Sequence, residues 1–159
     1  MKTTTKEIEK KYLIDISPDI LEGLKKQAHK KEAIAQSYIS YDPELRIRRS
    51  NSEYFFACKG EGLLERDEFE ISITQDQYER LHSLVSGYEI IKDRYHISLE
   101  GGLNAELDIF HGQLAGHITA EVEFKCKKCA MRFIPPAWFG KDVTECKEFK
   151  NKELSKNGL

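Results

Sequence analysis

The chain has 159 residues, of which 40% are hydrophobic and 33% are charged, and its formal net charge at pH 7 is -2. This length predicts one domain, residues 1–159, with a core of ordinary size. The small net charge gives no global attraction to nucleic acid or to a membrane, so a polyanion must be bound by a local concentration of cations. No apolar run approaches the roughly 20 residues of a membrane span, and "MKTTTKEIEK" lacks the apolar segment of a signal peptide, so we expect a cytoplasmic protein.

The first predicted elements are a strand in "KEIEKKYLID" (residues 6–15) and a helix in "SPDILEGLKKQAHK" (residues 17–30). Ser17 is placed as the N-cap of this helix, and Pro18 as its first residue. Four short strands rich in aromatic and β-branched residues follow, at 34–42, 44–50, 53–60 and 66–74.

A second helix is predicted in "TQDQYERLHSLVSG" (residues 74–87). Thr74 and Gln77 have the spacing of a capping box, and Gly87 lies near the expected end of the helix. Three more strands are then predicted at 90–98, 103–110 and 117–125. With the opening strand, the chain has eight predicted strands.

One face of seven of the eight predicted strands carries charged residues. Side chains alternate between the two faces of a strand, so the opening strand places Glu7, Glu9 and Lys11 on the same face. The corresponding residues of the later strands are Arg46 with Arg48, Lys59, Arg66 with Glu68 and Glu70, Lys92 with Arg94, Glu106 with Asp108, and Glu121 with Glu123. Two strands carry purely basic pairs and two carry purely acidic pairs, whereas an ordinary surface mixes the signs.

The ordinary explanation for such charges is the solvent-exposed face of an antiparallel sheet. The grouping by sign favours an inward face instead. The opposite faces are apolar and can pack against helices; they carry Ile8, Ile47, Phe69, Ile71, Leu107, Ile109, Val122 and Phe124. Eight antiparallel strands are enough to close a barrel around one small ligand. The sequence therefore predicts an α+β fold, a closed eight-stranded antiparallel β-barrel that forms a tunnel, with the helices packed outside.

A lumen that carries both signs of charge needs counter-ions, because buried unpaired charges are costly. A compact polyanion suits the cations, and a hard divalent metal suits the carboxylates. Mg²⁺ and Mn²⁺ prefer oxygen ligands and commonly bridge phosphate oxygens. The charge pattern therefore predicts that the tunnel binds a metal-bound oligophosphate.

The cysteines give a weaker signal. Cys126 and Cys129 in "CKKC" have the spacing of a zinc half-site, but Cys58 and Cys146 stand alone and form no second pair. Structural zinc and a redox pair are therefore the weaker alternatives. Reduced thiols with no role in the tunnel are expected.

Several short motifs follow one another along nearly the whole chain. The first is E-x-E-x-K, formed by Glu7, Glu9 and Lys11. It is followed by "RIRR", "CKGEG", "RDEFEI", "KDRY", "ELDIF" and "AEVEF", and by the tail "PPAWFGKDVT" with "NKEL". This series resembles the CYTH superfamily, the triphosphate tunnel metalloenzymes, and in particular its short bacterial members. The ordered series is much more specific than E-x-E-x-K alone.

The resemblance implies that basic side chains bind a triphosphate and that acidic side chains bind one or two divalent cations, Mg²⁺ or Mn²⁺. The implied substrate contacts are Lys11, Arg46, Arg48, Lys59, Arg66, Lys92 and Arg94. The implied metal ligands are Glu7, Glu9, Glu70, Glu121 and Glu123. Lys11 is also the catalytic candidate: we expect it to contact phosphate, and a role as general base is the alternative.

Family activities leave several functions open. The favoured one is hydrolysis of inorganic triphosphate, because nothing beyond the charged face indicates a nucleobase pocket. The alternatives are a class IV adenylyl cyclase, a nucleoside or thiamine triphosphatase, and a polyphosphate binder without catalysis. The sequence does not determine the oligomeric state, and a homodimer is among the open options.

Overall fold

The computed structural model describes residues 4–159. The strands are β1 (Thr4–Leu13), β2 (Lys30–Tyr41), β3 (Glu44–Ser50), β4 (Glu53–Lys59), β5 (Glu65–Ile73), β6 (Ser86–Ser98), β7 (Asn104–His111) and β8 (Ile118–Glu123). The α-helices are α1 (Pro18–Gln27), α2 (Gln75–His82), α3 (Lys127–Arg132) and α4 (Asn151–Asn157). Short 3-10 turns lie at Glu100–Gly102, Gly112–Leu114 and Lys147–Phe149.

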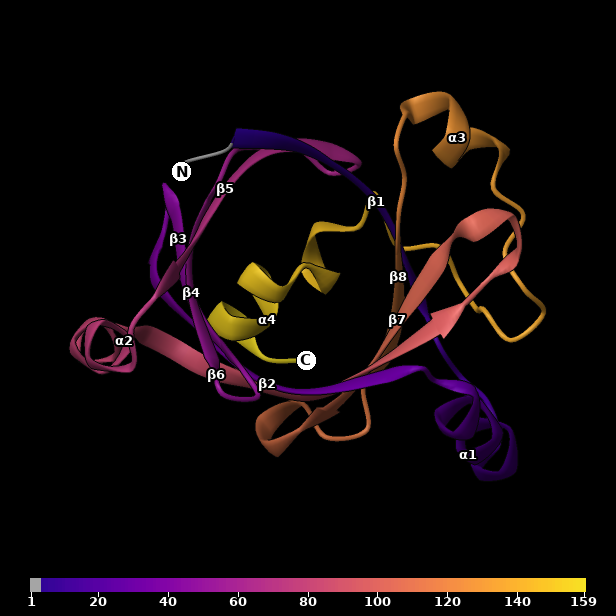
Figure 1. Cartoon of the computed structure of the whole chain (residues 1–159), viewed down its shortest axis with the longest axis horizontal. Helices are drawn as coiled ribbons and strands as arrows, with labels where there is room; N and C mark the ends of the chain where they lie inside the picture. Colours follow the sequence, from indigo (N-terminus) through magenta and orange to yellow (C-terminus); the bar gives the residue numbers. More distant parts are fainter. Residues whose placement is uncertain (1–3) are drawn as a thin grey trace.

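The strands form one closed antiparallel barrel in the order β1, β5, β4, β3, β2, β6, β7, β8. Figure 1 shows the ring that they make. β1 closes this ring because residues 4–8 pair with β5 and residues 9–13 pair with β8. The predicted eight-stranded antiparallel barrel is therefore confirmed.

Both helices predicted from capping signals are present. Ser17 Oγ accepts a hydrogen bond from the N–H of Ile20 at the start of α1. At the start of α2, Thr74 and Gln77 form the reciprocal hydrogen bonds of a capping box. None of the helices within residues 4–159 has the length and apolar character needed to cross a membrane.

Gly87 does not end α2, as its position in the sequence suggested, but lies in β6. Its φ is 73°, a conformation that favours glycine. A Cβ atom at this position would lie 1.9 Å from the Tyr41 hydroxyl oxygen and 2.5 Å from the carbonyl oxygen of Ser155. The glycine therefore allows β2, β6 and α4 to approach one another closely.

The apolar faces of the strands form the main core outside the lumen. Ile8 and Val122 pack there with Leu24 of α1 and Ala130 of α3. The apolar faces of the strands are not completely covered, since Ile71 on β5 remains 37% exposed.

α4 has a different position from the other helices, because it lies within the ring of strands (Figure 1). Leu154 is 1% exposed and packs against three residues of the barrel and its loops, Ile90, Phe110 and Leu114. Ser155 Oγ donates a hydrogen bond of 2.7 Å to the carbonyl of Tyr88. α1, α2 and α3 lie outside the ring, as expected for the helices, whereas α4 was not identified as a helix from the sequence.

Cys126 and Cys129 form a disulfide, so the expectation of reduced thiols was wrong for this pair. Cys126 is the N-cap of α3 and Cys129 lies in its first turn, which brings the two sulfurs together. Cys58 and Cys146 are free.

Candidate active site

The charged faces of the strands converge on one cavity of about 750 Å³ inside the barrel. All the candidate site residues line it: Glu7, Glu9, Lys11, Arg46, Arg48, Lys59, Arg66, Glu70, Lys92, Arg94, Glu121 and Glu123. Glu68 and Glu106 also line the cavity, and Asp108 is completely buried. The predicted inward direction of the charged faces is confirmed, while the role of each residue stays a prediction.

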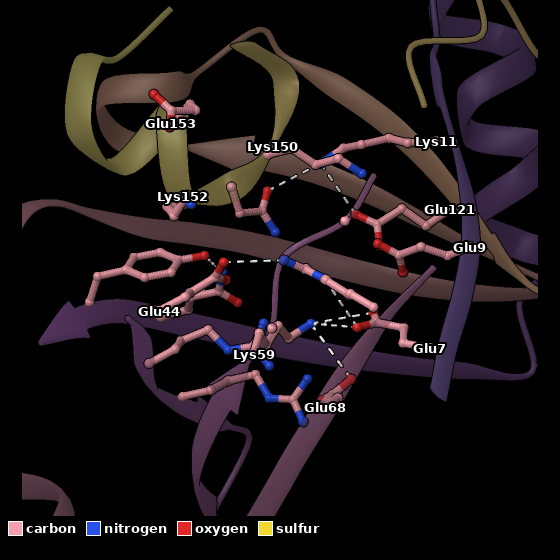
Figure 2. A pocket seen from close by; sticks show the side chains of 18 of the residues that line it. Glu7, Glu9, Lys11, Glu44, Lys59, Glu68, Glu121, Lys150, Lys152 and Glu153 are labelled. Carbon is pink, nitrogen blue, oxygen red and sulfur yellow. Dashed lines mark hydrogen bonds and ion pairs between the residues drawn. The ribbon is translucent and has the colours of Figure 1, made fainter. Parts of the chain in front are cut away.

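Lys59 of β4 lies beside carboxylates from two strands, as Figure 2 shows. Its Nζ atom is 3.0 Å from Glu7 Oε2 and 3.7 Å from Glu68 Oε2. Arg66 also contacts Glu7, at 3.5 Å, and Glu44, at 3.1 Å. Burial alone would raise the pKa of Glu7, but Lys59, a hydrogen bond from Glu68 and the charge of Arg66 lower it, so Glu7 is ionised.

Arg46 and Arg48 of β3 share the single carboxylate of Glu70. Their Nη2 atoms lie 3.3 Å and 3.1 Å from its oxygens. Burial, together with the charge of Arg46, lowers the pKa of Arg48. The Nε atoms of both arginines are buried and have no hydrogen-bond partner within the described residues. Two cations at one carboxylate leave an excess of positive charge, which fits an additional anionic oxygen.

Lys92 and Arg94 of β6 hold Asp108 of β7. Lys92 Nζ lies 2.6 Å from Asp108 Oδ2, and Arg94 Nε lies 2.7 Å from Oδ1. Arg94 also pairs with Glu106 at 2.6 Å. Burial, followed by repulsion from Arg94, lowers the pKa of Lys92 to about 8. Lys92 can therefore lose its proton near neutral pH more easily than an ordinary lysine.

Lys11 of β1 connects the strands to α4. Its Nζ atom is 3.4 Å from Glu121 Oε1 and 3.3 Å from Asn151 Oδ1. Burial alone would raise the pKa of Glu121, but Lys11 and Arg94 hold it well below its usual range. Glu9 shows the opposite behaviour, because burial and the charges of Glu121 and Glu7 raise its pKa well above the usual range.

The region around Glu9 has an excess of carboxylates. Neither Glu9 nor Glu123 has a cation within ion-pair distance among residues 4–159. Burial and the charges of Glu7 and Glu106 also raise the pKa of Glu123. Within the same part of the chain, no group of three or more His, Cys, Asp or Glu side chains forms a ready-made metal site. Glu9 and Glu123 therefore offer carboxylate oxygens without positive partners, which fits a hard divalent cation.

Several lining residues were not identified from the sequence. Gln36 and Tyr38 point into the cavity from β2, and Gln36 Nε2 donates a hydrogen bond of 3.0 Å to Tyr38 Oη. The alternation that identified the charged residues could have identified these two as well. Gln36 and Tyr38 lie on the same face of β2 as Ile34, which also lines the cavity. Lys150, the N-cap residue of α4, and Asn151, its first residue, also line the cavity. No periodic sequence pattern predicted a helix or a site at these residues.

Comparisons of this chain with a protein family and with known proteins agree with one another. The CYTH domain family matches residues 5–130. An inorganic triphosphatase from Nitrosomonas europaea is 40% identical over 152 residues, which cover 94% of this chain and 96% of that protein. An inorganic triphosphatase from Acetivibrio thermocellus is 32% identical over 156 residues, which cover 96% of this chain and 94% of that protein.

Solved structures agree with these relatives. The crystal structure of the inorganic triphosphatase NE1496 superposes with a TM-score of 0.67 at 39% identity, and the match covers 94% of this chain and 93% of that one. The family match extends over most of the chain, and the similarity to both relatives spans nearly all of it. The chain therefore belongs to the CYTH family.

Proposed function

We propose that this protein hydrolyses inorganic triphosphate to pyrophosphate and phosphate, with Mg²⁺ or Mn²⁺ as the required cation. The observation that carries this proposal is the convergence of basic side chains from five strands, Arg46 and Arg48 among them, on one lumen. The similarity to two inorganic triphosphatases over nearly the whole chain supports it.

The basic residues would hold the substrate from all sides. They come from β1, β3, β4, β5 and β6, so they surround a linear anion rather than contact it from one face. The two arginines of β3 offer planar donors, which suit phosphate oxygens. Phosphoryl transfer depends mainly on positioning and on neutralisation of charge, and this ring of cations can supply both.

The carboxylates divide into two groups in this proposal. Glu7, Glu9, Glu121 and Glu123 are the residues that would hold the cation, because they lie on the neighbouring strands β1 and β8. Glu70, also predicted as a metal ligand, lies instead between Arg46 and Arg48, where it would orient them. The bound cation would neutralise phosphate charge and favour ionisation of the attacking water.

Two lysines are candidates for the proton acceptor. Lys11 is held by Glu121 and by Asn151, an arrangement that suits a phosphate contact. Lys92 has a pKa lowered to about 8, so a useful fraction of it is neutral at mildly alkaline pH. We assign the proton-accepting role to Lys92 and phosphate contact to Lys11.

The start of α4 adds polar groups to the wall of the cavity. Lys150 and Asn151 line the cavity, and Asn151 accepts a hydrogen bond from Lys11. These groups suit a charged substrate and form no apolar pocket for a nucleobase.

Measurement of phosphate release tests the proposal. Inorganic triphosphate, ATP and thiamine triphosphate should be compared with Mg²⁺, with Mn²⁺ and with a chelator. We expect turnover of inorganic triphosphate to exceed that of the other two substrates, and chelation to abolish it. Cyclic AMP formed from ATP, or stoichiometric binding without turnover, would refute the proposal.

A further inference from the structure

The disulfide between Cys126 and Cys129 lies outside the tunnel and has no part in the proposed hydrolysis. Cys126 is separated from Glu123, the last residue of β8, by two residues, and Cys129 lies within α3. Cys129 is exposed and Cys126 is half-buried. A small thiol in solution can therefore reach the sulfur of Cys129 more directly than that of Cys126.

The two sulfurs have different surroundings. The backbone N–H of Cys129 donates a hydrogen bond of 3.1 Å to Cys126 Sγ. Lys127, between the two cysteines, lies 3.7 Å from Glu65 Oε2, so this hydrogen bond is the feature that distinguishes the two sulfurs. A hydrogen-bond donor stabilises a thiolate, and a sulfur that is more stable as a thiolate is the better leaving group in thiol–disulfide exchange.

We propose that this disulfide is a site of reversible exchange with low-molecular-mass thiols of the glutathione class. An external thiolate attacks Cys129 Sγ, the bond between the two protein sulfurs breaks, and Cys126 leaves as a thiolate. A second external thiolate then attacks the external sulfur of the mixed disulfide, which releases Cys129 as a thiolate. The two external thiols become a disulfide, the protein gains two electrons, and each protein thiolate takes a proton from water according to its pKa.

Contacts other than the disulfide hold α3 in place, so the helix can remain folded in both states. Ala130 is completely buried in the main core. Phe133, directly after α3, packs edge-on against Phe124 at 5.2 Å and against Tyr12 at 6.2 Å between ring centroids. Opening the disulfide removes neither contact, and Cys126 Sγ can still accept the N–H of Cys129.

The first experiment follows the equilibrium. The complete chain with Cys58→Ser and Cys146→Ser, which leaves only this pair, is incubated in glutathione buffers of graded composition. The exchange is then stopped with a large excess of N-ethylmaleimide near neutral pH, and the protein is analysed by intact mass spectrometry. We expect conversion between an unmodified and a doubly alkylated form in both directions without denaturant. A disulfide that opens only when the protein unfolds, or thiols that do not re-form it, would overturn the proposal.

The second experiment tests the direction of attack. Limiting glutathione followed by rapid alkylation should leave glutathione on Cys129 and the alkyl group on Cys126. In single variants that also carry Cys58→Ser and Cys146→Ser, the pH midpoint of the alkylation rate should be lower for Cys126 in Cys129→Ser than for Cys129 in Cys126→Ser. Glutathione found on Cys126, or a reversed order of midpoints, would overturn the assignment. Triphosphate hydrolysis by the same variants reports folding independently, because neither cysteine lines the tunnel.

Discussion

Lys11 and Glu121 lie directly opposite each other in the ladder between β1 and β8, and their side chains meet inside the tunnel at 3.4 Å. One is a proposed phosphate contact and the other a proposed metal ligand. In the protein without ligands, these two residues neutralise each other. When ligands bind, Lys11 would pair with a phosphate oxygen and Glu121 would pair with the cation, in place of their pairing with each other.

Glu123→Gln is the cleanest test of the proposed metal ligands. Glu123 has no ion pair to lose among residues 4–159, so the change removes a charge that a hard cation needs without exposing a buried partner. We expect turnover to fall at least tenfold at about 1 mM Mg²⁺ and to recover partly at higher Mg²⁺. Glu121→Gln should show a larger fall, because it also leaves Lys11 unpaired.

Calorimetric titration with triphosphate, with and without Mg²⁺, completes this test. Metal-free binding should survive in both variants, since fewer negative charges then repel the anion. Glu53→Gln, at an exposed position on β4, is the matched control. Wild-type turnover and metal requirement in both tunnel variants would place the metal elsewhere.

Arg48→Ala and Arg94→Ala should have different effects on stability. Arg48 shares Glu70 with Arg46, so its removal leaves that carboxylate paired. Triphosphate affinity should fall about tenfold, the value of one charge-assisted hydrogen bond, with an unchanged or higher melting temperature. Arg94→Ala leaves Asp108 paired with Lys92, but it removes two charge-assisted hydrogen bonds to this buried carboxylate and the ion pair of Glu106, at a cost of about 3 kcal/mol, which lowers the melting temperature by about 10 °C. Equal melting temperatures for the two variants would contradict this distinction.

The pH dependence of turnover distinguishes Lys92 from Lys11 as proton acceptor. A lysine accepts a proton only when it is neutral, and the pKa of Lys92 is lowered to about 8. Turnover by the wild type should therefore rise between about pH 7 and pH 9. Lys92→Arg keeps the positive charge but should abolish this rise, whereas Lys11→Arg should retain it. The opposite result would assign the role to Lys11.

His117 makes stability depend on pH. Burial, and then the charge of Lys11, lower its pKa from 6.5 to about 4, and its Nε2 atom has no hydrogen-bond partner within the described residues. Between these two values the unfolded chain binds more protons than the folded one, so the free energy of unfolding falls as the pH decreases from about 6.5 to about 4.

His117→Phe removes this contribution and keeps a ring between Phe110 and Phe149. Urea unfolding at several pH values should show the variant gaining stability over the wild type as the pH falls through this window. A constant difference between the two proteins from pH 8 to pH 4 would show that His117 does not titrate as described.

The inward charges could be predicted because a strand has a strict period of two. Applied to each strand in turn, the alternation groups Glu7 with Glu9 and Glu121 with Glu123, and a slip of one residue would reverse the face. The grouping of charges by sign then favoured a lumen with counter-ions over a solvent-exposed face.

The features that the sequence analysis missed or misassigned depend on tertiary contacts. α4 is short and is stabilised by Leu154 packing inside the ring, so its local sequence carries little helical signal. Gly87 resembled a helix stop, but the close approach of Tyr41 and Ser155 explains it. The pairing of Cys126 with Cys129 depended on where α3 begins.

The way β1 closes the ring also affects how the protein folds. Without β1, the other seven strands form an open sheet from β5 to β8, and the partners of β1 lie in the middle and near the far end of the chain. Contacts between such distant segments form slowly, because a long loop must close before they can form. We expect β1 to join last, and because β1 carries Glu7, Glu9 and Lys11, its joining also completes the binding site. A ligand that binds only the finished tunnel would then stabilise the closed barrel and leave the open sheet unaffected.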